Sequence, residues 1–166
     1  WTRTSDQGVK ESTAKNNHGT YYDLHVGSIA GYLERDDIVV GIYEASKNRL
    51  SHQVADDGSL PEELKRRTTA HYCAYTLQGW LNLYSLFCSL GIKLDYDYKE
   101  RLKKSVNWYL SYKGRIWPYE QIDEFDDGRM NVIDHLARDL GVISGAIQLE
   151  NKLIEKPLYC PHDGIK

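Results

Sequence analysis

The sequence predicts an all-α protein built from antiparallel helix pairs, and three observations lead to this prediction. Apolar residues recur at steps of three and four in successive segments, turn-forming residues separate those segments, and no segment has a convincing strand pattern. The 166 residues, 41% of them hydrophobic, suit one ordinary globular domain over 1–166. No apolar run approaches the roughly 20 residues that span a bilayer, so no membrane partner is expected.

Two helices are expected in the first third of the chain. Residues 1–20 are polar and show no periodicity, so we expect a loop there. From residue 22 the apolar positions follow at steps of four, three and four residues, which predicts a helix over 22–33. Asp36 and Asp37 then place negative charge where a second helix begins, and this helix is expected over 36–50.

The middle of the chain carries the most apolar helix. Residues 56–61 form a strong turn signal, and a helix is predicted over 69–90. Because apolar residues, Trp80 among them, lie nearly all round this helix, we expect it to be buried. Gly91 follows directly and is well placed to end the helix.

Two more helices are expected in the last third. An amphipathic helix is predicted over 97–110, followed by a loop over 111–128 that is rich in Tyr, Trp, Pro, Gly and Asp. A last helix is predicted over 130–154, with Gly141 as a weak or kinked point. The long loops would lie on one side of the helical array, where functional residues are common.

The composition favours a partly solvated surface that is rich in aromatic residues, and it disfavours nucleic acid as a partner. The chain has 13 Tyr and 4 Trp against 2 Phe and 1 Met, and aromatic rings with a polar end suit sugar faces. The net charge of −3 argues against a nucleic-acid-binding protein. Cys73, Cys88 and Cys160 lack a paired spacing, so we expect at most one disulfide and no zinc site.

The first candidate site segment lies just before the helix over 22–33. Lys15, Asn16, Asn17 and His18 bring a cation, two carboxamides and an imidazole to a helix start, where backbone N–H groups favour an anion. The alternative is structural: the polar side chains cap the helix and His18 is merely exposed.

The second segment precedes the buried helix. Lys65, Arg66 and Arg67 are three consecutive cations, and His71 and Tyr72 follow them. A charge run by itself is usually a solvated face, and Tyr72 by itself is more often a core or cap residue than a catalyst.

The third segment lies within the loop over 111–128. Pro118 stands between Trp117 and Tyr119, so these rings could form a platform that stacks on a sugar. Equally, Trp117 could fill the end of the core. The carboxylates that follow do not match a calcium-binding loop.

Together the three segments suit β-elimination from an acidic sugar polymer. This reaction removes the C5 proton beside a uronate carboxylate and expels the glycosidic oxygen at C4. Cations and amide donors on the carboxylate would stabilise the enolate-like state, as an oxyanion hole does. A tyrosine hydroxyl can protonate the leaving oxygen, and a neutral histidine is a candidate base. Paired carboxylates would instead suit a glycoside hydrolase, but no motif supports that use of Glu62 with Glu63 or Asp123 with Glu124.

These residues resemble the motifs of the alginate-lyase-type α/α-toroid polysaccharide lyases. Residues 16–23 are similar to the Asn-Asn-His motif of that family, residues 57–72 to its second motif, and residues 117–119 to a third. His18 and Tyr72 lie 54 residues apart, about the gap that the family shows. The resemblance extends over about residues 11–150 and implies that the helix pairs form an α/α toroid or part of one.

The resemblance implies roles for individual residues. Asn17 and Arg66 would neutralise the uronate carboxylate with help from His18. Tyr72 would protonate the leaving oxygen and, for one C5 configuration, also take the C5 proton, while His18 would be the base for the other configuration. Some branches have a spacing that points to Lys65, but the guanidinium of Arg66 can bind a carboxylate through two hydrogen bonds. Further substrate contacts would come from Lys15, Asn16, Tyr21, Arg67, His71, Trp117 and Tyr119.

One departure concerns size, because the toroids of this family have more helices than this chain can encode. We therefore expect an N-terminally incomplete portion of a larger catalytic domain, completed by the missing part of the same protein or by another chain. The expected partner is an acidic polysaccharide, with no cofactor and no metal, because Arg and Asn can replace a metal here. Alginate is the first candidate, and the alternatives are a glucuronan lyase, a glycosaminoglycan lyase or a non-catalytic binding module. Since such polymers are degraded outside the cytoplasm, a secreted or periplasmic protein is expected.

Overall fold

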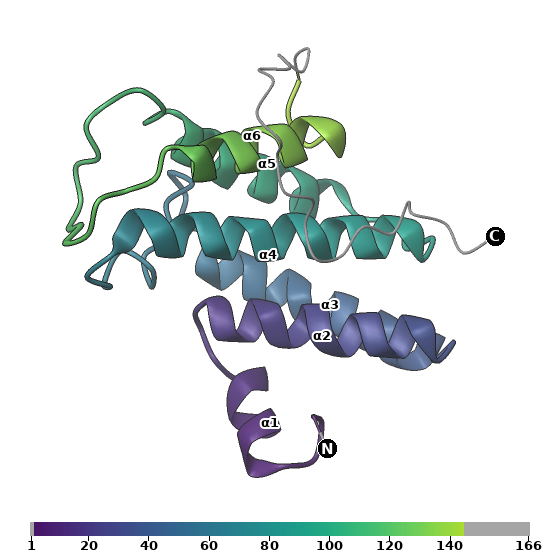
Figure 1. Cartoon of the computed structure of the whole chain (residues 1–166). Coiled ribbons are helices and arrows are strands. Elements are labelled where there is room, and N and C mark those ends of the chain that lie inside the picture. Colours follow the sequence, from purple (N-terminus) through teal and green to yellow (C-terminus); the bar gives the residue numbers. More distant parts are fainter. Residues whose placement is uncertain (1, 145–166) are drawn as a thin grey trace.

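The computed structural model describes residues 2–144, and within them the prediction of an all-α fold is confirmed. The ribbon in Figure 1 contains helices joined by loops and turns. The helices are α1 (Asp6–Ser12), α2 (Asn17–Tyr32), α3 (Asp36–Gln53), α4 (Thr69–Ser89), α5 (Tyr96–Leu110) and α6 (Gly128–Asp139).

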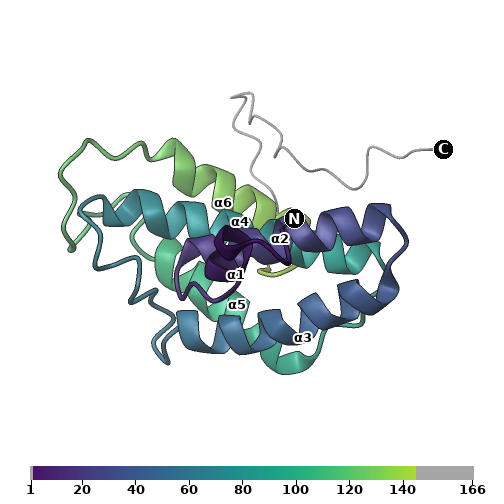
Figure 2. The same ribbon diagram turned by 90° about the horizontal axis from the view of Figure 1, so that it is seen from below.

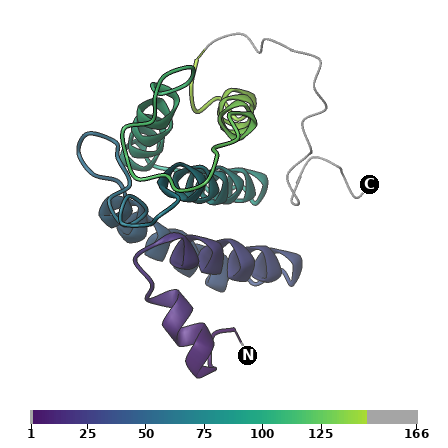
Figure 3. The same ribbon diagram turned by 60° about the vertical axis from the view of Figure 1, so that its left-hand side comes forward.

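The helices are arranged as antiparallel pairs around α4. Helices α2, α4 and α6 run in the same direction in Figure 1, and α4 packs against both of the others. Helices α3 and α5 run back in the opposite direction and contact each other as well as α2 and α4, respectively. Figure 3 shows α5 and α6 side by side on one flank of α4, with α1 beyond α2 on the other.

This arrangement brings the loops that carry the candidate residues to one end of the molecule. Because α2, α4 and α6 are parallel, their N-terminal ends lie together, and the loops over 54–68 and 111–127 both extend from that end (Figures 1 and 2). The predicted grouping of the long loops on one side is therefore confirmed.

The core is centred on α4, as the sequence predicts. Leu81, Leu86 and Phe87 are fully buried and, at about 100° per residue, lie on different sides of this helix, so α4 packs against the core all round. Full burial of one such side chain contributes about 1.5–3 kcal/mol relative to exposure. Gly91 directly follows the helix cap with a φ of 75°, a left-handed conformation that glycine adopts without strain.

The expected loop over residues 1–20 is wrong, because this region contains α1 and the first turn of α2. Both helix starts are held by polar side chains: the Ser5 hydroxyl accepts the N–H of Gly8 at 3.1 Å, and Asn16 Oδ1 accepts the N–H of His18 at 3.2 Å. The helical period of apolar residues is missing here because α1 and the start of α2 are short, polar segments.

The predicted helix over 130–154 is also wrong at its C-terminal end, because α6 stops at Asp139. Gly141 has a φ of 66°, and the N–H of Val142 turns back to the carbonyl oxygen of Ala137 at 2.8 Å, which ends the helix instead of kinking it. Residues 145–154 lie outside the described part of the chain. None of the helices within 2–144 is long and apolar enough to cross a membrane.

Candidate active site

The four predicted catalytic residues come from the N-terminal ends of two neighbouring helices. Asn17 and His18 are the first residues of α2, while Arg66 and Tyr72 flank the start of α4. Since α2 and α4 are parallel and pack directly against each other, their starts lie side by side (Figure 1).

Asn17 is fixed by several contacts at the start of α2. Its side chain is buried, with 4% of its surface exposed, and its backbone N–H donates to Glu63 Oε1 at 2.7 Å. The preceding Asn16 is fixed as well, because Gln53 Nε2 donates to its carbonyl oxygen at 2.8 Å. Among residues 2–144, Asn17 Oδ1 is buried and finds no hydrogen-bond partner.

Glu63 has a buried carboxyl group. From the sequence, this residue is considered only as one half of a possible carboxylate pair with Glu62. It is 2% exposed, whereas Glu62 binds Lys65 Nζ at 2.6 Å near the surface, so the two carboxyl groups do not share a cleft. Burial raises the pKa of Glu63, and the N–H of Asn17 and the charges of Arg66 and His18 oppose that rise. Both side chains therefore lie within electrostatic reach of this carboxyl group.

Arg66 and Tyr72 form one unit. The guanidinium carbon of Arg66 lies 4.1 Å from the centroid of the Tyr72 ring, which is a cation–π contact. The Arg66 N–H donates to the carbonyl oxygen of Glu63 at 3.2 Å. Lys65 is engaged elsewhere, with Glu62, and its side chain is 67% exposed. The geometry thus places Arg66, and not Lys65, against the tyrosine.

His18 is partly exposed but is not free of contacts. Its Nδ1 atom lies 2.7 Å from Glu11 Oε2, and its side chain is 52% exposed. A pocket of about 330 Å³ opens beside it, with His25 and Tyr75 among the lining residues. Sequence reasoning missed Glu11 because α1 was not predicted, and it missed His25 and Tyr75 because neither belongs to a recognisable motif.

Tyr21, a predicted substrate contact, lines the same pocket. Its ring stacks on that of Tyr75 with centroids 4.3 Å apart, and its hydroxyl donates to the Tyr75 carbonyl oxygen at 3.1 Å. Burial raises the pKa of the Tyr21 hydroxyl, so this group is a hydrogen-bond donor rather than a base.

Trp117 packs into the end of the core, which matches the structural interpretation of the third segment. Its indole N–H donates to Thr69 Oγ1 at 2.8 Å, and its ring meets four other aromatic rings at steep angles. Tyr119 belongs to the same group of rings, and burial, together with a hydrogen bond to Tyr112, raises its pKa to about 12. The aromatic residues in contact are Trp108, Tyr109, Tyr112, Trp117 and Tyr119.

The loop over 111–127 is tied to the start of α4 by a short antiparallel contact. Thr68 and Gln121 form an isolated bridge, and the N–H of Ile122 donates to the Arg67 carbonyl oxygen at 3.0 Å. The predicted contact residue His71 takes part, since its Nδ1 atom lies 2.8 Å from Gln121 Nε2. Lys15 and Arg67 have exposed side chains at the same end of the molecule.

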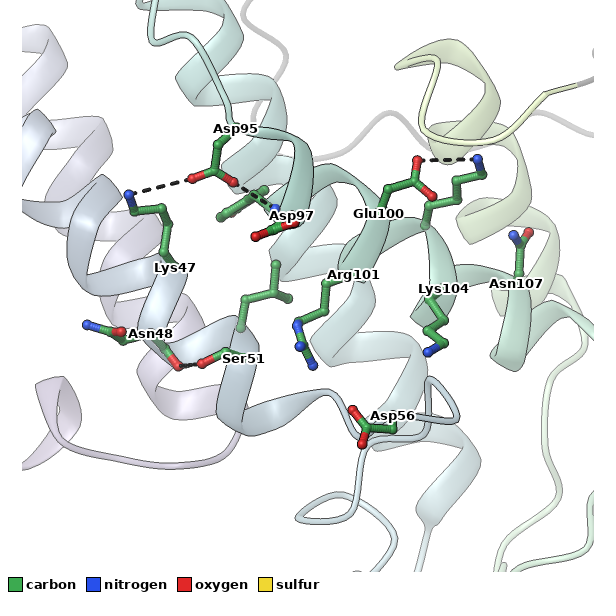
Figure 4. A pocket seen from close by; sticks show the side chains of 13 residues that line it. Lys47, Asn48, Ser51, Asp56, Asp95, Asp97, Glu100, Arg101, Lys104 and Asn107 are labelled. Carbon is green, nitrogen blue, oxygen red and sulfur yellow. Dashed lines mark hydrogen bonds and ion pairs between the residues drawn. The ribbon is translucent and has the colours of Figure 1, made fainter.

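A larger pocket lies elsewhere and contains none of the predicted site residues. It has a volume of about 750 Å³ and lies between α3 and α5, as Figure 4 shows. Two of its cations already have partners: Lys47 Nζ lies 3.5 Å from Asp95 Oδ2, and Arg101 donates to the Val54 carbonyl oxygen at 3.0 Å. With both signs of charge and these internal contacts, it offers an acidic polymer little net attraction.

Two cysteines lie within residues 2–144. Cys73 is buried and Cys88 is exposed, and both are free; Cys160 lies outside that range. No group of three or more His, Cys, Asp or Glu side chains within it is suited to hold a metal ion.

Parallel helices with a polar site at their N-terminal ends define the class: the described helix pairs form part of an α/α toroid. The sequence profile of the alginate lyase family matches residues 1–116, and the chain belongs to this family. It is also similar to the crystal structure of an alginate lyase from Bacteroides ovatus, with a TM-score of 0.78 and 29% identity. That match covers 85% of this chain and 40% of the other, so the chain spans about 40% of the length of that enzyme. No curated protein matches the sequence.

Proposed function

We propose that this chain carries the active site of a polysaccharide lyase that cleaves a 1,4-linked uronate polymer, with alginate as the first candidate. The observation that carries the proposal is the convergence of Asn17, His18, Arg66 and Tyr72 at the neighbouring starts of α2 and α4. Membership of the alginate lyase family supports it.

The proposed reaction is β-elimination. A base takes the proton from C5 of the uronate, the electron pair forms a double bond between C4 and C5, and the bond from C4 to the glycosidic oxygen breaks. The leaving oxygen takes up a proton. Negative charge builds up on the uronate carboxylate as the C5 proton leaves, so donors around that carboxylate lower the barrier.

The residues at the starts of α2 and α4 supply each of these functions. Asn17 and Arg66 neutralise the carboxylate, and the contact between Arg66 and the Tyr72 ring supports a role for Tyr72 beside the same group. Tyr72 protonates the leaving oxygen and takes the C5 proton of one epimer. His18 is the base for the other epimer, and its contact with Glu11 through Nδ1 leaves Nε2 for this task.

The chain spans about 40% of the length of the Bacteroides ovatus enzyme, so we extend the proposal to the whole protein. Further helices, from the same protein or another chain, would complete the ring around the site of this single domain. Because the substrate is a large polymer, we propose that the protein acts outside the cytoplasm.

The test is the ultraviolet absorbance of the unsaturated uronate product, measured separately on alginate, glucuronan and hyaluronan with the full-length protein. Absorbance that rises fastest on alginate supports the proposal. A faster rise on glucuronan or hyaluronan replaces alginate with that substrate, and binding without any rise on the three polymers identifies a non-catalytic binding module.

A further inference from the structure

Glu63 joins the two halves of the candidate site. Its buried side chain accepts the backbone N–H of Asn17 at 2.7 Å, across 46 positions of the sequence. Its own carbonyl oxygen accepts the N–H of Arg66 at 3.2 Å. The same residue therefore contacts the start of α2 through its side chain and the Arg66 segment through its backbone.

The start of α2 depends on this distant carboxyl group, as the start of α4 depends on the Gln121 side chain, which accepts the N–H of Ala70 at 3.0 Å. The first N–H groups of a helix have no partner within the helix. In α5 the adjacent Asp95 satisfies one of them, accepting the N–H of Tyr98 at 2.8 Å. In α2 the adjacent Asn16 accepts the N–H of His18 through its side chain and that of Gly19 through its carbonyl oxygen, and the N–H of Asn17 is left to Glu63.

We propose that Glu63 is a positioning residue whose side-chain length sets the separation of Asn17 and Arg66, so that both reach one uronate carboxylate. The inference rests on the proposed lyase function. The role requires a hydrogen-bond acceptor of this length and not a negative charge, which would repel the substrate. The burial of Glu63 agrees with a role that needs no charge, because burial raises the pKa of its carboxyl group and disfavours the charged form.

Two substitutions separate length from charge. Glu63→Gln keeps the acceptor and the length but cannot ionise, whereas Glu63→Asp can still ionise and shortens the side chain by one methylene. We expect kcat per folded molecule to fall about 100-fold in Glu63→Asp and to stay within about threefold of wild type in Glu63→Gln, because misplacement by about 1 Å costs roughly that factor. KM changes less than kcat in both. A merely structural role would lower the unfolding midpoint of Glu63→Asp without changing kcat per folded molecule.

A second measurement does not depend on turnover. Amide hydrogen exchange of the peptide over residues 15–22 should be faster in Glu63→Asp and unchanged in Glu63→Gln. The matched control is Tyr43→Phe, which removes a buried hydroxyl that accepts the N–H of Asp95 at 3.0 Å, in the contact between α3 and the start of α5. This variant should alter neither kcat nor exchange over 15–22.

The outcomes are distinct for the two proposals. Glu63→Asp with wild-type kcat and exchange, or Glu63→Gln with the larger loss of kcat, overturns the positioning role. If the wild-type protein has no lyase activity, the proposed function fails, and hydrogen exchange together with alginate binding by the same variants still decides whether Glu63 positions Asn17.

Discussion

Two groups of residues at the same end of the molecule differ in how well their polar atoms are satisfied. The polar cluster consists of Asn17, Glu63, Arg66 and Tyr72, and the aromatic cluster consists of Trp108, Tyr109, Tyr112, Trp117 and Tyr119. In the polar cluster, Asn17 Oδ1 and Glu63 Oε2 are buried without a partner among residues 2–144. In the aromatic cluster, the Trp117 indole N–H and the Tyr109 hydroxyl donate to Thr69 and Ala70, respectively.

The aromatic cluster uses its polar atoms within the fold, whereas the polar cluster contains the residues that we propose act on the substrate. A ring that uses its polar atom internally and packs edge-on against its neighbours contributes to the core. We therefore expect substitutions in the polar cluster to affect turnover and those in the aromatic cluster to affect stability.

The largest effect is expected from Tyr72→Phe, which removes the proposed proton donor and keeps the ring against Arg66. Turnover should fall about 10²–10⁴-fold, the usual contribution of a general acid or base. Polymer binding and the unfolding midpoint should be nearly unchanged. Tyr96→Phe is the control, because Tyr96 lies on α5 and is 75% exposed. Full activity of Tyr72→Phe would show that another group protonates the leaving oxygen.

His18→Ala should act selectively on the two uronate epimers. Turnover is expected to fall about 10²–10³-fold on alginate enriched in one epimer, and only slightly on alginate enriched in the other, since His18 serves as base for one configuration. Initial rates on the two substrate preparations test this. An equal loss on both would contradict the role as an epimer-specific base.

Arg66→Gln should lower turnover about 100-fold, the usual cost of losing one donor to a developing oxyanion. Lys65→Gln is the matched comparison, since Lys65 lies next in sequence and pairs with Glu62 at the surface. Its effect should be small, as exposed ion pairs contribute little. If Lys65→Gln causes the larger loss of turnover, Lys65 and not Arg66 binds the uronate carboxylate.

The smallest of these effects is expected in the aromatic cluster. Trp117→Leu loses the hydrogen bond to Thr69 and several ring contacts, so the free energy of unfolding should fall by about 2 kcal/mol for this half-buried residue. Urea denaturation measures it. An unchanged midpoint with weaker polymer binding would show that Trp117 is a sugar platform.

Helices with strong apolar periodicity were predictable, and segments held by polar contacts were not. The predicted helices over 36–50, 69–90 and 97–110 agree with α3, α4 and α5 to within a few residues, because each buries an apolar face. Helix α1 and the start of α2 were missed, since caps from Ser5 and Asn16 hold them. The end of α6 was missed because the left-handed conformation of Gly141 shows only in the backbone.

The sequence by itself determined the class of fold and the chemical groups of the candidate site, because residue types and their spacing carry that information directly. It named Asn17, His18, Arg66 and Tyr72, yet it left open whether the arginine or Lys65 faces the tyrosine. Only the tertiary structure decided that question and the packing of Trp117. It also revealed Glu63, whose contact with Asn17 spans 46 positions and exists only because α2 and α4 lie parallel and side by side.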